Sequence, residues 1–151
     1  MEIKFDMNFS MIEIIKLITR LYMPLSGYWI DEIKENAEAY KFAEAGYMSL
    51  NDEYKDKYII NSKGKEYLHP YIERISNNFI TFMKKHQMSC STEEIINWYA
   101  EKYSLDDVEI AKDIAEYICT NLETYNYRAT PFYSSRQGNG YQIENLVAAH
   151  I

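Results

Sequence analysis

The stretch Tyr58-Ile59-Ile60-Asn61-Ser62-Lys63-Gly64-Lys65-Glu66-Tyr67-Leu68 decides the expected fold. It runs from a β-prone segment through a lysine–glycine turn into a pattern typical of a helix. A second β-prone run, Tyr47–Leu50, lies upstream and is joined to the first by the polar residues 51–56. This order predicts a β-hairpin over about residues 47–61 with a charged tip. A helix is expected to follow, with Pro70 in its first turn.

Helical spacing of apolar residues predicts three helices before this hairpin. The first covers Met11–Tyr22, with one apolar stripe at positions 11, 14, 15, 18, 21 and 22. Ser26 is the expected N-cap of the second helix, which is predicted to run through Tyr28 to Ala37. The third helix is short, covers residues 39–45 and ends at Gly46, a residue suited to a left-handed cap.

The second half of the chain repeats this order more loosely. The helix after Pro70 has an apolar stripe, and Ser91 with Glu94 forms a capping box for a helix over residues 93–103. Ser104 is the expected cap of one more helix. A final hairpin is predicted from Tyr125 to Ile143, with Gly138-Asn139-Gly140 supplying the positive-φ residues of a tight turn. The two apolar helix faces contain Ile72, Ile75, Phe79, Phe82 and Met83 in the first case, and Leu105, Val108, Ala111, Ala115, Ile118 and Leu122 in the second.

Three local motifs resemble those of winged helix-turn-helix proteins. Met23-Pro24-Leu25-Ser26-Gly27-Tyr28 is similar to the segment that leads into the second helix of PadR-type regulators. The stretch 58–68 resembles the wing exit shared by PadR-type and MarR-type proteins, and Glu44-Ala45-Gly46-Tyr47 resembles the end of their recognition helix. The resemblance covers about residues 10–70. It implies a mainly α (α+β), winged-helix-like fold and the function of a DNA-binding transcription regulator.

The repeated order of elements suggests two tandem units, each a helical bundle with a β-hairpin. Residues 1–70 would form the winged-helix-like unit. Residues 71–151 would form a second helical unit with a C-terminal β-hairpin, and the two are expected to share one core.

The charge of the helices departs from this resemblance. The third helix of a DNA-reading winged helix presents Arg, Lys, Asn or Gln to base edges in the major groove. Residues 36–45 instead carry Glu38 and Glu44 against the single base Lys41. The equivalent helix of the second half is more acidic still, and duplex DNA repels an acidic helix. These helices are therefore not expected to read DNA.

Composition limits the class of protein. The 151 residues carry a formal net charge of −7, with 47% hydrophobic and 26% charged residues, which is typical of a globular chain rather than a disordered one. Residues 1–6 contain acids where a secretory signal peptide needs a basic flank, and no run approaches the roughly 18 apolar residues of a membrane span. We expect a cytoplasmic protein without a membrane partner, in which Cys90 and Cys119 are free and buried.

The main candidate site is a group of acids between residues 91 and 123, where nine acids face two bases. One interpretation is a solvated helix face with acids favoured near its N-terminus. The other is a docking surface for a basic partner. The predicted partner-binding residues are Asp106, Asp107, Glu109, Asp113 and Glu116.

A second candidate site consists of the lysines in and after the predicted hairpin. They either keep the hairpin solvated and block edge-to-edge pairing or contact phosphates as a wing would. The alternative nucleic-acid-binding residues are Lys55, Lys57, Lys63 and Lys65.

Catalytic, cofactor and metal sites are not expected. No base, nucleophile or metal ligand lies at useful spacing from the acids, and Gly138-Asn139-Gly140 lacks the lysine and helix of a phosphate loop. His86 and Cys90 lie four residues apart, a spacing that could bind a metal, but no second pair accompanies them. The aromatic residues of the last hairpin either fill its core or form an interface; they are Tyr125, Tyr127, Phe132, Tyr133 and Tyr141.

The sequence thus favours a non-enzymatic, acidic protein-binding module of the immunity-protein or antitoxin type, which would occupy a basic site such as that of a nuclease toxin. The alternative function is a winged-helix transcription regulator that contacts DNA through its wing.

Overall fold

The computed structural model describes residues 9–22, 26–136 and 138–147. Helices cover 56% of the described residues and strands 21%, so the prediction of a mainly α, α+β protein is confirmed at the level of fold class. The chain divides into two compact units, Met1–His69 and Pro70–Ile151. None of the helices in the described ranges is both long and apolar enough to cross a membrane.

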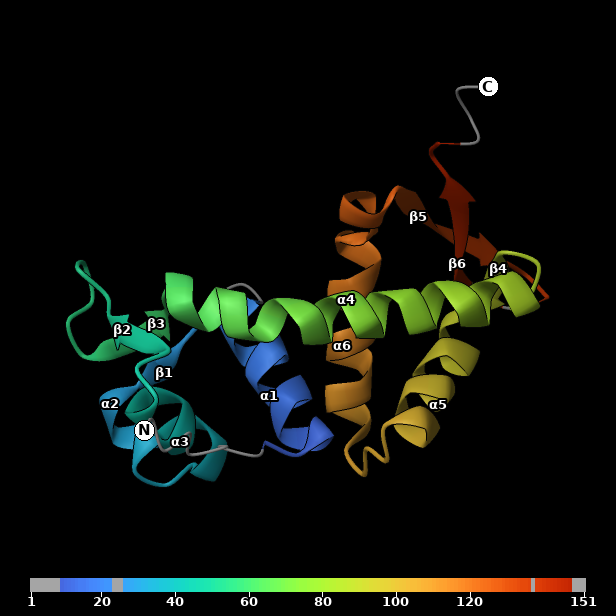
Figure 1. Ribbon diagram of the computed structural model, residues 1–151. Coiled ribbons are helices and arrows are strands. Elements are labelled where there is room, and N and C mark those ends of the chain that lie inside the picture. The colour runs from blue at the N-terminus through green and yellow to red at the C-terminus, as the bar shows by residue number, and fades with distance from the viewer. Residues whose placement is uncertain (1–8, 23–25, 137, 148–151) are drawn as a thin grey trace. The chain divides into compact units, whose positions relative to one another are not determined.

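The first unit contains α1 (Met11–Tyr22), β1 (Tyr28–Trp29), α2 (Ile30–Ile33), α3 (Ala37–Glu44), β2 (Met48–Leu50) and β3 (Lys57–Ile60), followed by the start of α4 (Ser62–Lys85). Its three strands form an antiparallel sheet in the order β1-β3-β2 (Figure 1). Met48 pairs with Ile60 and Tyr28 pairs with Tyr58. The last strand of the unit is therefore the middle strand of its sheet.

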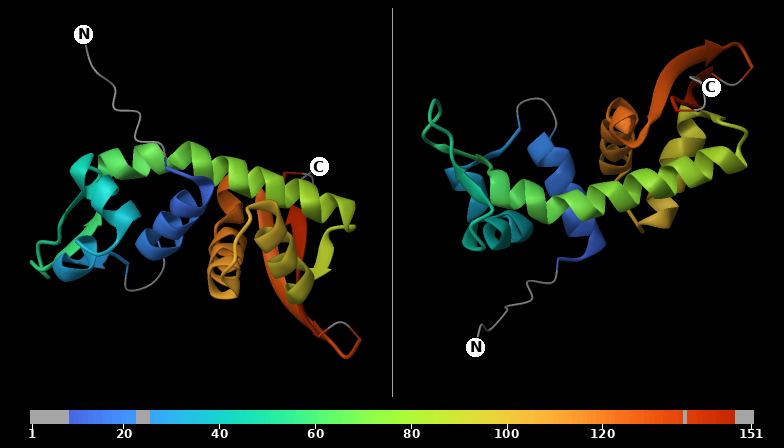
Figure 2. Two further views of the ribbon diagram at one scale, coloured as in Figure 1. Left: turned by 90° about the horizontal axis from the view of Figure 1, so that it is seen from below. Right: turned by 45° about the horizontal axis from the view of Figure 1, so that its top comes forward.

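The second unit has the same order of elements. After the remainder of α4 come β4 (Ser89–Ser91), α5 (Thr92–Lys102), α6 (Val108–Thr120), the 3-10 turn η1 (Leu122–Tyr125), β5 (Tyr127–Ser134) and β6 (Gly138–Asn145). The sheet order is β4-β6-β5, again antiparallel with the last strand in the middle. Figure 2 shows β5 and β6 as a long, curved hairpin.

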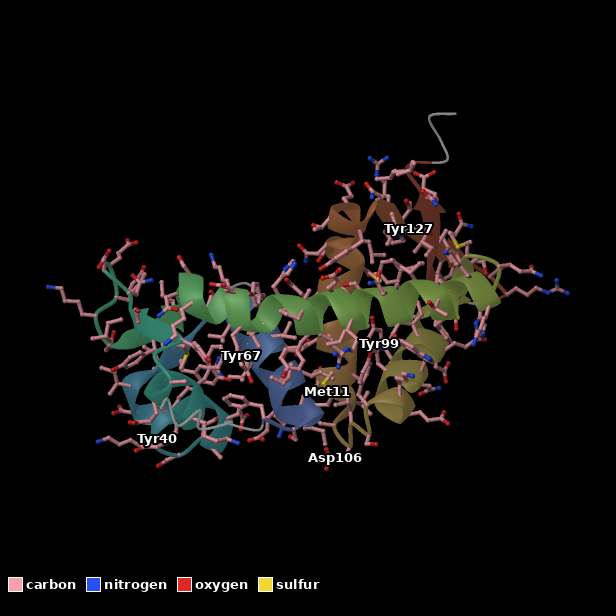
Figure 3. All side chains as sticks on the ribbon, in the orientation of Figure 1. Met11, Tyr40, Tyr67, Tyr99, Asp106 and Tyr127 are labelled. Atoms are coloured by element: carbon pink, nitrogen blue, oxygen red, sulfur yellow. The ribbon has the colours of Figure 1, made fainter. Side chains whose placement is uncertain are left out.

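Aromatic and aliphatic side chains fill both units. In the first, Ile14, Leu17 and Ile18 of α1 are completely buried, and the rings of Tyr47 and Tyr67 stack with centroids 4.7 Å apart. The core of the second unit consists mainly of side chains from α4, α5 and α6. Their completely buried side chains include Ile75, Phe79, Ile95, Tyr99, Ile114 and Ile118, and the labelled Tyr67 and Tyr99 mark the two clusters in Figure 3.

Several local predictions are confirmed. β2 and β3 form the hairpin expected over about residues 47–61, and α1 covers the predicted Met11–Tyr22. Gly46 follows α3 with a φ of +80°, the left-handed conformation of a helix cap. Ser91 caps α5 by accepting a hydrogen bond from the backbone N–H of Glu94 at 3.2 Å. Cys90 and Cys119 are free and buried.

The predicted second helix is wrong at both ends. Tyr28 lies in β1, and Trp29 rather than Ser26 precedes α2. α2 ends at Ile33, and Ala37, the predicted end of this helix, is the first residue of α3. Gly27 has a φ of +114°, and a Cβ there would lie 2.5 Å from the carbonyl oxygen of Tyr58. Because of this close approach to β3, Tyr28 and Trp29 pair in the sheet, and α2 begins only at Ile30.

The predicted start of α4 is also wrong, because the helix begins at Ser62 and Pro70 lies inside it. The side chain of Asn61 accepts a hydrogen bond from the backbone N–H of Gly64 at 2.9 Å, which starts the helix early. Gly64 packs directly against the backbone carbonyl of Tyr47, leaving no room for a side chain. Figure 1 shows α4 as one continuous helix.

The predicted turn of the last hairpin is wrong, because residues 138–140 belong to β6. Gly138 does have a positive φ, of +72°, but it is the first residue of β6, and Gly140 pairs with Phe132 inside the sheet. A Cβ on Gly140 would lie 2.5 Å from the ring of Phe132. Gly140 is therefore a site of close packing and not a turn residue.

Candidate functional site

Three acids of the second unit lie in a line along α6, where Glu109 and Glu116 are exposed and Asp113 is half-buried. Glu109, Asp113 and Glu116 follow each other at intervals of four and three residues, so they share one face of the helix. Ala111, Ile114, Ala115 and Ile118 on the opposite side are buried. We call Asp106, Asp107, Glu109, Asp113 and Glu116 the acidic stripe.

The two acids before the helix have different roles. Asp107 is the N-cap of α6 and accepts a hydrogen bond from the backbone N–H of Glu109 at 2.9 Å. Asp106 is exposed and points outward from the segment before α6 (Figure 3). Asp107 therefore both stabilises the helix and adds charge to the stripe, since an acid at this end also opposes the positive pole of the helix.

The expected start of this helix needs correction. Ser104, the predicted N-cap, lies four residues before the helix and has a φ of +55°. Val108, which was predicted on the buried face, is 64% exposed in the first turn of α6. Both differences follow from capping by Asp107, which begins the helix at Val108.

The charges of the acidic stripe act on one another. Burial raises the pKa of Asp113 above its ordinary value of 3.8, and the charges of Glu109, Glu116 and Asp107 raise it further. Lys112 lowers it in part. The carboxylates are therefore close enough to repel, and one lysine does not neutralise them.

A small apolar pocket lies beside the stripe. Residues of α5, α6 and β6 line it, and the described lining residues are Thr92, Ile95, Ile96, Lys112, Ala115, Glu116 and Tyr141. Burial raises the pKa of the Tyr141 hydroxyl, as do the charges of Cys119 and Glu116. Glu116 thus belongs both to the acidic stripe and to the rim of the pocket, a feature that sequence periodicity could not reveal.

The four lysines of the alternative site are not equivalent. Lys55 lies in the exposed loop between β2 and β3, and Lys65 is exposed on α4. The Nζ of Lys57 lies 5.2 Å from the centre of the Trp29 ring. The Nζ of Lys63 donates to the backbone carbonyl of Ala45 at 3.3 Å, at the C-terminus of α3. Lys63 therefore has a structural partner, whereas Lys55 and Lys65 face solvent.

The aromatic residues of the last hairpin divide between its two faces. Tyr127 and its neighbour across the sheet, Asn145, contribute to the packed side, where Tyr127 is buried and Lys84 lies over its ring. Tyr133 is 75% exposed. Tyr125, Phe132 and Tyr141 are half-buried. The hairpin thus contributes Tyr127 to the interior and leaves Tyr133 on its surface.

A third cluster was not predicted as a site. A ring nitrogen of His86, the Sγ of Cys90 and a carboxylate oxygen of Glu94 lie within 4.8 Å of one another. The Cys90 thiol donates to Glu94 Oε2 at 3.0 Å. Burial and this carboxylate raise the pKa of the thiol to about 12. Glu94 was predicted to return to the backbone of Ser91 in a capping box, and that assignment concealed its contact with Cys90.

Comparison of the chain with protein-family models, with curated proteins and with solved structures finds no match.

Proposed function

We propose that the protein is a non-enzymatic protein-binding module whose acidic stripe on α6 docks onto a basic site of another protein. The observation that carries this proposal is the alignment of Glu109, Asp113 and Glu116 on the face of α6 opposite its buried residues. Burial and the neighbouring charges there also raise the pKa of Asp113. Like charges at helical spacing destabilise a helix. Their placement on one exposed face is explained if a cationic partner relieves the repulsion.

The surroundings of the stripe support a mixed polar and apolar contact. A lysine or arginine of the partner could place its charged head at Asp113 and Glu116 and its aliphatic stem against the pocket that Ala115 and Tyr141 line. Opposite charges on the two surfaces would speed their encounter. A buried carboxylate–guanidinium pair would then slow dissociation.

The class of partner we favour is a nuclease or another toxin with a basic active-site cleft. Such a cleft must attract phosphate, so an acidic protein can occupy it without any catalysis of its own. An immunity protein or antitoxin in the cytoplasm has this character, and the exposed Tyr133 on the last hairpin adds a residue type that is common at protein interfaces.

The second candidate is a winged-helix transcription regulator. It is favoured by the order of elements, since each unit consists of a helix, a strand, two helices and two strands, with the last strand in the middle of the sheet. We propose on this basis that the chain consists of two tandem winged-helix-like units. DNA contact would depend on Lys55, Lys57 and Lys65, because Lys63 donates a hydrogen bond to the backbone carbonyl of Ala45. The helices α3 and α6 are acidic and would not contribute.

The two functions predict opposite effects on binding when the acidic stripe is neutralised. The stripe-neutralised variant carries Asp106→Asn, Asp107→Asn, Glu109→Gln and Asp113→Asn, and asparagine at position 107 keeps a capping side chain. A matched control neutralises four exposed acids of the first unit, Glu35, Asp52, Glu53 and Glu66. Both variants change the net charge by the same amount.

We expect the native chain to capture a basic protein from an extract of its host, the control to capture it equally, and the stripe-neutralised variant to lose it. With the purified partner, the stripe-neutralised variant should bind at least about tenfold more weakly, which is 1.4 kcal/mol. The regulator function predicts the opposite for duplex DNA: neutralising the stripe would tighten binding, and Lys55→Ala with Lys65→Ala would abolish it.

A further inference from the structure

The connection between α4 and α5 brings together three side chains that bind metals. His86 follows α4, Cys90 lies in β4, and Glu94 lies in the first turn of α5. Gln87 and Met88, which lie between His86 and Cys90, have φ values of +59° and +66° respectively. The backbone N–H of Met88 donates to the carbonyl of Met83 at 2.7 Å. The chain therefore turns sharply after α4, and the turn places His86 beside Cys90.

The separations suit a small cation. One ligand atom from each residue lies within 4.8 Å of the other two, and the Cys90 Sγ is 3.0 Å from Glu94 Oε2. Tetrahedral zinc has bonds of about 2.3 Å to sulfur and about 2.1 Å to nitrogen and oxygen, which places its ligand atoms roughly 3.4–3.7 Å apart. Closing the widest separation requires about 1 Å of movement, and the side chains of His86 and Glu94 are both exposed.

The orientation of His86 is fixed by a second interaction. Its Nδ1 lies 3.0 Å from the carbonyl oxygen of Phe82. Because a carbonyl only accepts hydrogen bonds, this contact favours the neutral tautomer with its proton on Nδ1 and a lone pair on Nε2, the form that binds a metal. The ring also lies against that of Phe82, with centroids 4.3 Å apart. Metal-binding histidines almost always donate the N–H of the non-ligating nitrogen to a carboxylate, a backbone carbonyl or water.

We propose that His86, Cys90 and Glu94 form a zinc-binding site, with water in the fourth position. Thiolate and imidazole ligands together favour zinc over magnesium or calcium, which prefer oxygen ligands. On binding, the Cys90 thiol releases its proton to solvent and the zinc ion replaces that proton in the contact with Glu94. The charge of the ion is sufficient to deprotonate a coordinating thiol.

The site would join three elements of the second unit. α4 ends just before His86, β4 contains Cys90, and α5 contains Glu94. Zinc bound only by the folded chain stabilises it by mass action. This inference does not depend on the acidic stripe, because none of its three residues belongs to it.

The test uses the full chain without an affinity tag, reduced and freed of metals by a chelator. We expect it to bind one zinc ion per chain and to melt at a higher temperature with zinc. Cobalt(II) in place of zinc should give the near-ultraviolet charge-transfer band of a thiolate ligand. His86→Ala, Cys90→Ser and Glu94→Gln should each weaken zinc binding by about 100-fold or more, because even loss of an outer-shell partner costs 10–100-fold.

Two matched controls separate this site from adventitious binding. His69→Ala removes an exposed histidine of the first unit, and Glu93→Gln removes the neighbouring acid of the same helical turn. Both should bind zinc as the native chain does. Cys90→Ser can keep the hydrogen bond to Glu94, so the variant is expected to fold. The proposal is overturned if zinc fails to bind, if cobalt gives no thiolate band, or if Glu94→Gln and Glu93→Gln bind zinc equally well.

Discussion

Neutralising Asp113 should stabilise the protein. Asp113 has Glu109 four residues before it and Glu116 three residues after it, and burial together with these charges raises its pKa. Each like-charge pair at such spacing costs about 0.2–0.5 kcal/mol. Asp113→Asn removes two pairs, and asparagine has nearly the helix propensity of aspartate. We therefore expect a gain of about 0.5 kcal/mol, or roughly 1–2 °C in Tm for a chain of this length.

The pH and salt dependence of this gain follows from the same charges. Because the folded pKa of Asp113 is above 3.8, the folded state takes up the proton first as the pH falls. The difference between variant and native chain is complete at neutral pH and disappears as the pH falls through the folded pKa toward 3.8. It should also shrink in 1 M salt, where the Debye length is about 3 Å.

Urea denaturation of the two proteins at low salt is the assay, with Lys112→Gln as the matched control. Lys112 lies three residues after Glu109 and four residues before Glu116, a spacing at which opposite charges stabilise a helix. Removing its charge should therefore destabilise the chain by a similar amount. A loss of stability in Asp113→Asn at low salt would refute the account of mutual repulsion. So would a gain of stability in Lys112→Gln.

Three further predictions concern the framework around the site. Ser91→Ala removes the cap of α5 and should cost about 1 kcal/mol of unfolding free energy while leaving partner binding intact, as denaturation and binding titrations would show. Burial alone would raise the pKa of Glu32, but hydrogen bonds and charge from Arg20, with other contacts, lower it below 4.5. Stability should therefore fall as the pH drops below 4.5 through the folded pKa, and less steeply in Glu32→Gln, when melting temperatures are followed against pH. The buried hydroxyl of Tyr99 has no hydrogen-bond partner among the described residues, so Tyr99→Phe should leave Tm unchanged or raise it by removing an unsatisfied polar atom; a drop of several degrees would contradict this.

Local sequence signals predicted those parts of the fold that depend on neighbouring residues. The apolar spacing of α1 and the N-cap of α5 at Ser91 each depend on residues of one helix only, and the sequence predicts both. The placement of Glu109 and Asp113 away from the core could be predicted because Ala111, Ala115 and their neighbours define the buried side of α6.

Non-local contacts account for the features that sequence reasoning missed. Tyr28 belongs to a strand only because Tyr58, thirty residues later, pairs with it. Pro70 lies within α4 because that helix begins at Ser62, next to Gly64, which packs against the distant backbone carbonyl of Tyr47. Helical spacing does not indicate such partners.

The pocket is missed for the same reason, because it combines α5, α6 and β6 and no single segment contains its pattern. The proposed zinc site is missed for another reason. The spacing of His86 and Cys90 is noted, but Glu94 is predicted to return to the backbone of Ser91, whereas its carboxylate accepts a hydrogen bond from the Cys90 thiol.

The affinity of the captured basic partner for the native chain and for the stripe-neutralised variant, measured across a range of salt concentrations, tests the central claim most directly. We predict that the native chain binds much more tightly at low salt and that the difference narrows as salt rises past about 0.15 M, where the Debye length is about 8 Å. The control with neutralised acids in the first unit should follow the native chain. Equal affinity of the native chain and the stripe-neutralised variant at every salt concentration would contradict the proposal that α6 is the docking surface.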